Sequence, residues 1–177
     1  MEAYIKKYII TGAPGTGKTT LINALEKEYP CMHEVSRKVI ICEQEGVGNG
    51  MPWGDLDRFA ALVYEASLQA LDLSPNAYFT DRSILDLIAY LEVAGKPIPS
   101  QLVRFPYKEK FRKKVFFTPT WEDIYHKDEQ RLQEFDYCLA LEQALLKIYA
   151  EKRFDIVKLP KDTVSIRVNF VHTFVKT

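Results

Sequence analysis

The stretch IITGAPGTGKTT, residues 9–20, decides the fold of this chain. A short apolar run leads into the pattern G-x-x-x-x-G-K-T, which extends from Gly12 to Thr19. Glycines at these positions let backbone N–H groups turn toward phosphate oxygens, and the positive end of the following helix adds to the attraction. The stretch therefore predicts a strand, a phosphate-binding loop (P-loop) and a helix that hold a nucleoside triphosphate.

Nine consecutive residues make up the expected phosphate grip: Gly12, Ala13, Pro14, Gly15, Thr16, Gly17, Lys18, Thr19 and Thr20. Within it, Lys18 would reach the β- and γ-phosphates, and the Thr19 hydroxyl would ligate Mg²⁺. The expected cofactors are ATP or GTP together with Mg²⁺, because the motif binds phosphates and does not select the base. The alternative is a chance glycine-rich loop between a strand and a helix.

Length and composition are those of a globular protein. The chain has 177 residues, 47% of them hydrophobic, and domains commonly contain ~100–200 residues, so we expect one domain over residues 1–177. Lys plus Arg equals Asp plus Glu at 24 each, which indicates no nucleic-acid or membrane partner. Three cysteines, Cys31, Cys42 and Cys138, lack C-x-x-C spacing, and this favours reduced thiols over a zinc site. The N-terminus shows no signal-peptide core, so we expect a complete cytoplasmic protein.

Apolar periodicity predicts strands and helices in alternation. The predicted strands span residues 4–11, 31–35, 77–80, 114–118 and 154–159, and the predicted helices span 18–28, 36–45, 55–73, 83–94 and 134–151. Residues 163–175 fit both a helix and a strand, and the alternation favours a helix with Asp162 as its N-cap.

Five strands that alternate with helices require crossover connections, and these produce a parallel sheet covered on both faces. The sequence thus predicts an α/β protein with a three-layer P-loop NTPase fold. Ligands of such sheets bind at the carboxyl ends of the strands. The P-loop, Glu34, Asp81 and Thr118 each follow a predicted strand, so we expect them at one edge of the sheet.

The segment FTDRS, residues 79–83, contains the second chemical signal. A carboxylate at the end of a strand beside the P-loop can hold the water shell of Mg²⁺, so Asp81 is expected to bind the metal together with Thr19. Arg82 would direct its planar donor fork at phosphate oxygens. The alternative hypothesis is that Asp81 only caps the helix that begins near Ser83.

The segment HEVSR, residues 33–37, contains the third signal. Glu34 is expected at the tip of the second strand, where a second substrate would lie, and its carboxylate could accept a proton from an attacking hydroxyl. Arg37, three residues later, could bind an anionic group of that acceptor. The alternative is a surface ion pair between Glu34 and Arg37, and His33 is interpreted as incidental.

Three connecting segments carry weaker signals. The glycine-rich loop 46–54 could fold over an acceptor with Trp53 as a stacking face, or could be a plain flexible connection. Residues 118–134 could form a lid that supplies Arg131, or an inert surface connection. The basic segment 104–114 interleaves six Lys and Arg with aromatic residues; it could meet phosphate-rich partners, although a solvated face is favoured.

Four segments, GAPGTGKTT, HEVSR, FTDRS and PTWEDIYHKDEQR, together resemble the AAA-type P-loop ATPase family that includes the kinase domain of NadR and the TRPL translocation defect proteins. The resemblance covers nearly the whole chain and implies a fold like that of nucleoside and nucleotide kinases. Those kinases use a glutamate after the second strand as base and a D/E-R-S arginine on phosphates, which implies catalytic roles for Glu34, Asp81 and Arg82. They usually offer more than one lid arginine, whereas this chain has Arg131 alone in that segment.

The function expected from these residues is phosphoryl transfer from the nucleotide to a small hydroxyl- or phosphate-bearing acceptor, nucleoside-like or another metabolite. Glu34 would act as the base, and the loop 46–54, the lid and the basic segment would shape the acceptor site. The alternative is a regulatory nucleotide switch, or a slow ATPase or GTPase, without a small-molecule acceptor. A glutamine placed to orient water would favour that alternative, and Gln44 and Gln130 are weakly placed for it.

Overall fold

The computed structural model describes residues 4–126 and 134–175. Its centre is a parallel sheet of five strands in the order β2-β3-β1-β4-β5. The strands are β1 (Lys7–Thr11), β2 (Cys31–Met32), β3 (Phe79–Asp81), β4 (Phe111–Phe117) and β5 (Asp155–Lys158). The predicted fold class, an α/β sheet of five parallel strands between layers of helices, is therefore confirmed.

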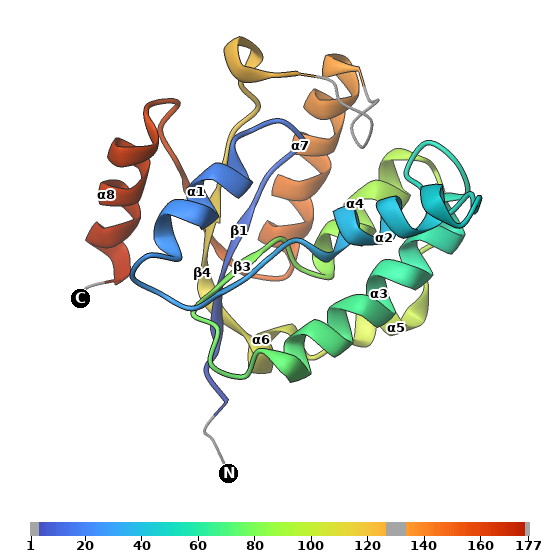
Figure 1. Ribbon diagram of the computed structural model, residues 1–177, viewed down its shortest axis with the longest axis horizontal. Helices are drawn as coiled ribbons and strands as arrows, with labels where there is room; N and C mark the ends of the chain where they lie inside the picture. Colours follow the sequence, from blue (N-terminus) through green and yellow to red (C-terminus); the bar gives the residue numbers. More distant parts are fainter. Residues whose placement is uncertain (1–3, 127–133, 176–177) are drawn as a thin grey trace.

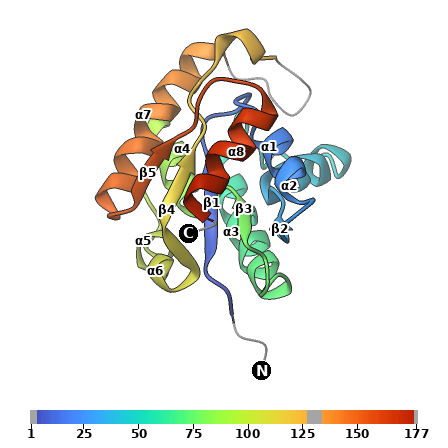
Figure 2. The ribbon, with the colours of Figure 1, turned by 90° about the vertical axis from the view of Figure 1, so that its left-hand side faces the viewer.

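Helices cover the sheet on both sides (Figures 1 and 2). They are α1 (Lys18–Leu25), α2 (Val35–Glu45), α3 (Leu56–Leu73), α4 (Leu85–Val93), α5 (Ser100–Arg104), α6 (Tyr107–Lys110), α7 (Phe135–Glu151) and α8 (Val164–Val175), with a 3-10 turn, η1 (Glu122–Ile124). Helices α1 and α8 lie together on one face, and α4 and α7 lie on the other (Figure 2). Within the described ranges, no helix combines the length and the apolar character needed to cross a membrane.

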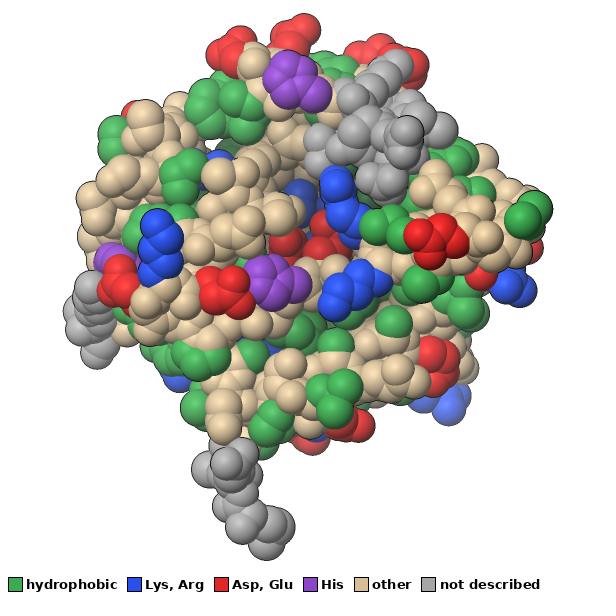
Figure 3. Space-filling view, viewed as in Figure 1, with side chains coloured by type: hydrophobic (Ala, Val, Ile, Leu, Met, Phe, Trp, Pro, Cys, Tyr) green, Lys and Arg blue, Asp and Glu red, His purple; other side chains and the backbone are tan. Residues whose placement is uncertain are grey.

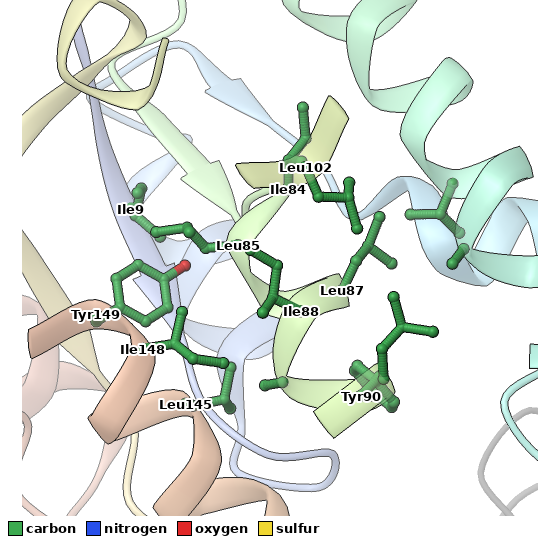
Figure 4. Close-up of a cluster of buried hydrophobic side chains, with 14 of the residues drawn as sticks. Ile9, Ile84, Leu85, Leu87, Ile88, Tyr90, Leu102, Leu145, Ile148 and Tyr149 are labelled. Atoms are coloured by element: carbon green, nitrogen blue, oxygen red, sulfur yellow. The ribbon is translucent and has the colours of Figure 1, made fainter. Parts of the chain in front are cut away.

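The alternation of side chains along β1 builds the two cores, because successive residues of a strand point to opposite faces. Tyr8 and Ile10 pack with α1 and α8, whereas Ile9 belongs to the larger core under α3, α4 and α7. In that larger core, Leu85 and Ile88 of α4 lie beside Ile9 of β1 and the α7 side chains Tyr149 and Ile148 (Figure 4). The carboxyl end of β1, where the P-loop begins, is thereby buried between the two cores.

The C-terminal segment is helical, as the alternation of elements predicted. Its cap is different from the predicted one, because the Ile166 N–H donates to the hydroxyl of Thr163 at 3.4 Å. The carboxylate of Asp162 instead accepts from the Thr163 N–H at 2.6 Å. Thr163 is therefore the N-cap of α8, and the prediction of Asp162 was wrong by one residue.

The basic segment 104–114 is only partly a solvated face. Arg104 and Lys108 are exposed, but Phe105, Tyr107 and Phe111 are buried, and β4 begins at Phe111 rather than at residue 114. Burial of three aromatic side chains outweighs the cost of drawing charged neighbours against the protein. The segment thus closes the core at the edge of the sheet opposite the P-loop (Figure 1).

Packing of α7 against α4 should dominate the stability of the larger core. Ile148 is 2% exposed and Leu139, on the same helix, is 44% exposed. We expect Ile148→Ala to lower the free energy of unfolding by about 2–5 kcal/mol, because it removes buried methyl groups and leaves a cavity. Leu139→Ala, the matched control, should cost less than about 1 kcal/mol. Urea denaturation of both variants tests this; equal losses would contradict the described packing.

Candidate active site

The P-loop is shaped by the close approach of β1 and β4. A Cβ on Gly12 would lie 2.2 Å from the hydroxyl and 2.3 Å from the carbonyl oxygen of Thr118, which follows β4. Only glycine can occupy that position. Gly17 is the N-cap of α1 and has a φ of 75°, a left-handed conformation that glycine adopts without strain. These two glycines let the loop turn tightly above the sheet and present its N–H groups to one point.

Lys18 lies inside this loop and is 5% exposed. Its ammonium donates to the Ala13 carbonyl at 2.6 Å and to the Thr16 hydroxyl at 3.2 Å. Burial, and then the charge of Arg82, lowers the pKa of Lys18 to about 7. A triphosphate in the loop would supply negative charge beside the ammonium and restore its proton affinity.

Arg82 follows β3 in a strained conformation, with a φ of 70°. Its N–H donates to the Ile10 carbonyl at 2.9 Å, so the backbone remains joined to β1. The guanidinium turns back over the P-loop: Nε donates to Glu34 at 2.7 Å and Nη1 donates to the Gly12 carbonyl at 3.0 Å. A left-handed conformation costs a residue with a side chain about 1–2 kcal/mol, and these contacts hold the guanidinium at the edge of the site.

Asp86 completes the network around Arg82 and was not predicted from the sequence. Its carboxylate accepts from the Thr11 hydroxyl at 2.7 Å, from the Tyr149 hydroxyl at 2.6 Å and from Nη1 of Arg82 at 3.3 Å. The available signal was its spacing, since a residue four positions after Arg82 lies on the same side of a helical turn. Asp86 anchors Arg82 from the protein interior.

Asp81, the last residue of β3, is 3% exposed, and both of its carboxylate oxygens lack a hydrogen-bond partner among the described residues. It does not cap α4, because the Leu85 N–H donates to the Ser83 hydroxyl at 3.2 Å. Burial, and then the charge of Glu34, raises the pKa of Asp81 to about 6. A buried carboxylate with two free oxygens beside the P-loop strand fits a magnesium ion, which typically takes one or two carboxylates and the phosphates of its substrate.

Glu34 is the N-cap residue of α2, but its side chain makes no capping hydrogen bond. Its carboxylate accepts from Arg82 and from the Ser36 hydroxyl, and its side chain is 18% exposed. Burial alone would raise the pKa of Glu34, but the charges of Arg82 and Lys18 outweigh it and lower the pKa to about 2. Glu34 thus forms an ion pair with Arg82. His33 pairs with Glu26 at the surface at 2.8 Å, away from this network.

A cavity of about 510 Å³ is lined by Lys18, Glu34 and Arg82 together. The P-loop forms its middle, from Pro14 to Thr20. One end is lined by residues of α2, α3 and α4 and their flanks: Glu34, Ser36, Arg37, Ile40, Pro52, Phe59, Arg82 and Tyr90. The other end is lined by Trp121, Ile124, Asp162, Thr163, Val164 and Arg167. The hollow is visible in Figure 3, where acidic and basic side chains meet inside it.

The structure brings together most of the residues singled out in the sequence, including Lys18, Thr19, Glu34, Arg37 and Arg82 on this one cavity. Asp81 lies next to it and lines a small adjoining cavity with Glu34 and Arg82. Gly12 and Ala13 do not line the main cavity; they support the loop from below.

Two other predicted residues are not placed at the cavity. Trp53 is half-buried against the larger core and does not line the cavity, although its neighbour Pro52 does. Trp121 lines the cavity instead, and its position after β4 was the only sequence signal for it. Arg131 belongs to residues 127–133, which lie outside the described residues. The roles of Trp53 and Arg131 stay predictions.

Comparisons with known proteins identify a family and similar folds. A family model described as an AAA domain matches residues 7–167. No curated protein matches the sequence. The fold is similar to that of a deoxyadenosine kinase from M. mycoides with bound dATP, with a TM-score of 0.72 at 14% identity over 98% of this chain and 100% of that chain.

Two further structures are similar. A thymidylate kinase from Candida albicans gives a TM-score of 0.67 at 18% identity, covering 99% of this chain and 93% of that chain. The M. mycoides deoxyadenosine kinase with the products dCMP and dCDP gives 0.69 at 13% identity, covering 96% of this chain and 98% of that chain. At these identities the likeness shows a shared fold and nothing finer.

The unpaired carboxylate of Asp81 should destabilise the nucleotide-free protein at neutral pH. Folding raises its pKa from 3.8 to about 6, so the penalty is full above pH ~6 and vanishes below pH ~4, where the carboxyl is protonated in both states. We expect Asp81→Asn to raise the free energy of unfolding at pH 7 by up to about 3 kcal/mol and to change little at pH 4. Urea denaturation at the two pH values measures this.

The control for this prediction is Asp57→Asn, which removes an exposed carboxylate that pairs with Lys96 at 2.7 Å. It should change stability by less than about 1 kcal/mol at either pH. A loss of stability in Asp81→Asn at pH 7 would mean that the carboxylate makes a stabilising contact in the native state, and the metal interpretation would lose its main support.

Proposed function

The chain belongs to the AAA domain family of P-loop proteins, and from that premise we propose that it is a Mg²⁺-dependent kinase that transfers the γ-phosphate of ATP or GTP to a small acceptor. The acceptor would be nucleoside-like or another metabolite. The narrower resemblance to the NadR and TRPL members of the family stays a prediction.

One observation carries this proposal: Glu34 and Arg82, joined at 2.7 Å, stand on the wall of the same cavity as the P-loop. Beyond them the cavity continues between Ile40, Phe59 and Tyr90. A plain NTPase needs room for one water molecule, whereas apolar and aromatic walls with a few polar groups suit an organic ligand. The extra space therefore supports an acceptor other than water.

The phosphate side of the site would work through the P-loop and its neighbours. Lys18 would bind the β- and γ-phosphates, and Thr19 and Asp81 would hold Mg²⁺, directly or through its water shell. When bound, Mg²⁺ neutralises charge that builds on the phosphate oxygens during transfer. Arg82, already oriented by Asp86 and Glu34, would stabilise the transferring phosphoryl group without first having to be ordered.

In the proposed step, the acceptor oxygen forms a bond to the γ-phosphorus while the bond from that phosphorus to the β-phosphate oxygen breaks. If the acceptor is a hydroxyl, its proton passes to Glu34, which is ionised at neutral pH because its pKa is about 2. The low pKa makes Glu34 a weak base, which is compatible with a loose transition state in which the proton leaves late. Arg37, which lines the acceptor end, would bind an anionic group of the acceptor.

Lys18 should decide nucleotide affinity. A nucleotide at ~100 times its Kd adds ~2.7 kcal/mol, or roughly 5–10 °C of melting temperature for a protein of this size. Lys18→Ala removes a charge-assisted contact worth ~1.5–3 kcal/mol and should weaken Mg-ATP binding about tenfold to a hundredfold. Thermal-shift assays with Mg-ATP measure the stabilisation of the wild type and the weaker binding of Lys18→Ala. The control is Lys147→Ala, on the exposed face of α7. Identical shifts in wild type and Lys18→Ala would place the nucleotide elsewhere.

Glu34 should matter for transfer and little for nucleotide binding. A general base contributes ~10²–10⁴ in rate, so Glu34→Gln should reduce acceptor-dependent ADP or GDP release by that range and leave hydrolysis by water much less affected. Release is measured with a library of nucleosides, nucleotides and other metabolites. Should no acceptor raise the rate and both proteins hydrolyse the nucleotide equally, the regulatory switch or slow NTPase would replace the kinase hypothesis.

A further inference from the structure

Arg167 stands on the buried face of α8, where apolar side chains are expected. The helix has the sequence VSIRVNFVHTFV, and the residues that it buries are Arg167 and Val171. Arg167 is 3% exposed. Arginine is almost never buried to this extent without an anionic partner, because removing a charge from water is costly. Its position therefore requires an explanation that helix packing does not provide.

The contacts of Arg167 within the protein are few. Nη2 donates to the Thr16 carbonyl at 3.2 Å, and Nε has no hydrogen-bond partner among the described residues. Within the same ranges, no carboxylate forms an ion pair with the guanidinium. Burial accordingly lowers the pKa of Arg167 below its ordinary value. A single neutral carbonyl does not compensate a buried guanidinium, which has five donors to satisfy.

The guanidinium lies directly against the P-loop. A Cβ on Gly17 would come within 2.8 Å of Nη1 of Arg167 and within 3.5 Å of Ile124. Gly17 thus leaves room for Arg167 as well as adopting the turn conformation. Thr16 and Gly17 belong to the phosphate grip. Arg167 therefore lies close enough to contact a ligand that this grip holds.

The end of the cavity at which Arg167 lies identifies the part of the ligand that it would meet. Glu34 and Arg82 line one end, and Arg167 lines the other end beside Thr163 and Val164, with the P-loop between them. A triphosphate that directs its γ-phosphate toward Glu34 must direct its nucleoside toward α8. The phosphates themselves would be bound by the P-loop N–H groups and Lys18.

We infer that Arg167 binds the nucleoside part of the triphosphate, with its guanidinium plane against the base, and couples that contact to the P-loop through Thr16. This inference rests on the proposed function in one respect only, namely that the nucleotide binds with its γ-phosphate toward Glu34. A weakly hydrated, planar guanidinium is suited to a flat aromatic face, and such contacts strengthen when water is excluded. The ligand class is a nucleoside triphosphate with an intact base, in contrast to triphosphate alone.

The test compares ligands with and without the nucleoside. Isothermal titration calorimetry measures Mg-ATP, Mg-GTP and Mg-tripolyphosphate binding to the wild type, Arg167→Gln and Arg167→Lys. We expect Arg167→Gln to weaken the preferred nucleotide about 3- to 30-fold and tripolyphosphate less than about twofold. Arg167→Lys retains the positive charge but lacks the planar guanidinium, so it should lose most of the preference for nucleotide over tripolyphosphate. Arg104→Gln, the same change at an exposed arginine of α5, should alter neither ligand.

Three results would overturn the inference. They are an equal loss for nucleotide and tripolyphosphate, which would mean that Arg167 only supports Thr16; no change for either; and a wild type that binds tripolyphosphate as tightly as nucleotide. Should Arg167→Gln fail to fold, the comparison of wild type with Arg167→Lys decides. Because these are binding measurements, the absence of any phosphate acceptor would refute the kinase proposal and leave this result standing.

Discussion

The guanidinium of Arg82 joins the parts of the chain that make the site. Through it the end of β3 meets the start of α2 at Glu34, the P-loop at the Gly12 carbonyl, and α4 at Asp86. Asp86 extends the same network to Thr11 of β1 and Tyr149 of α7. Loss of this one cation would leave the buried carboxylate of Asp86 and the partly buried carboxylate of Glu34 with hydroxyl donors alone, which is more costly than the loss of a single neutral hydrogen bond. The backbone strain at Arg82 is maintained because so many contacts oppose its release.

The other charges near the P-loop are held less well. Lys18 donates only to neutral oxygens, both oxygens of Asp81 lack partners, and Arg167 is bound by one carbonyl, all within the described residues. Each of these groups is buried, so we expect each to lower the stability of the nucleotide-free protein. Lys18 would be neutralised by phosphate, Asp81 by a metal ion, and Arg167 would be covered by a base. One magnesium nucleotide contains all three of these parts. Such a ligand would stabilise the fold by completing contacts that the protein leaves incomplete.

The contrast between the two ends of the cavity bears on the chemistry. At the acceptor end, Glu34 and Arg82 satisfy each other, and the walls beyond them are apolar and aromatic. That end can therefore exist in its final geometry before a substrate arrives, which suits a catalytic pair that must be oriented in advance. At the nucleotide end, by comparison, the Arg167 guanidinium is bound by one carbonyl and has no anionic partner among the described residues. The difference is compatible with tight binding of a common nucleotide and selective admission of a second substrate.

The sequence by itself determined the parallel sheet, the P-loop and the edge at which Glu34, Asp81 and Arg82 meet, because these follow from local patterns: an apolar run, glycine spacing, and a polar residue directly after a strand. Helix ends differed from the predicted ones by up to three residues: α8 is capped by Thr163, and α1 ends at Leu25 rather than at residue 28. Neighbouring residues can cap or end a helix almost equally well, so local sequence does not fix these ends. Only the tertiary structure decided that Arg82 pairs with Glu34 and Asp86, that Trp121 rather than Trp53 lines the cavity, and that Arg167 reaches the P-loop from α8. Arg167 and Thr16 are 151 positions apart in the sequence. Their contact exists because α8 packs beside α1 on one face of the sheet, and no local pattern encodes which side chains that packing brings together.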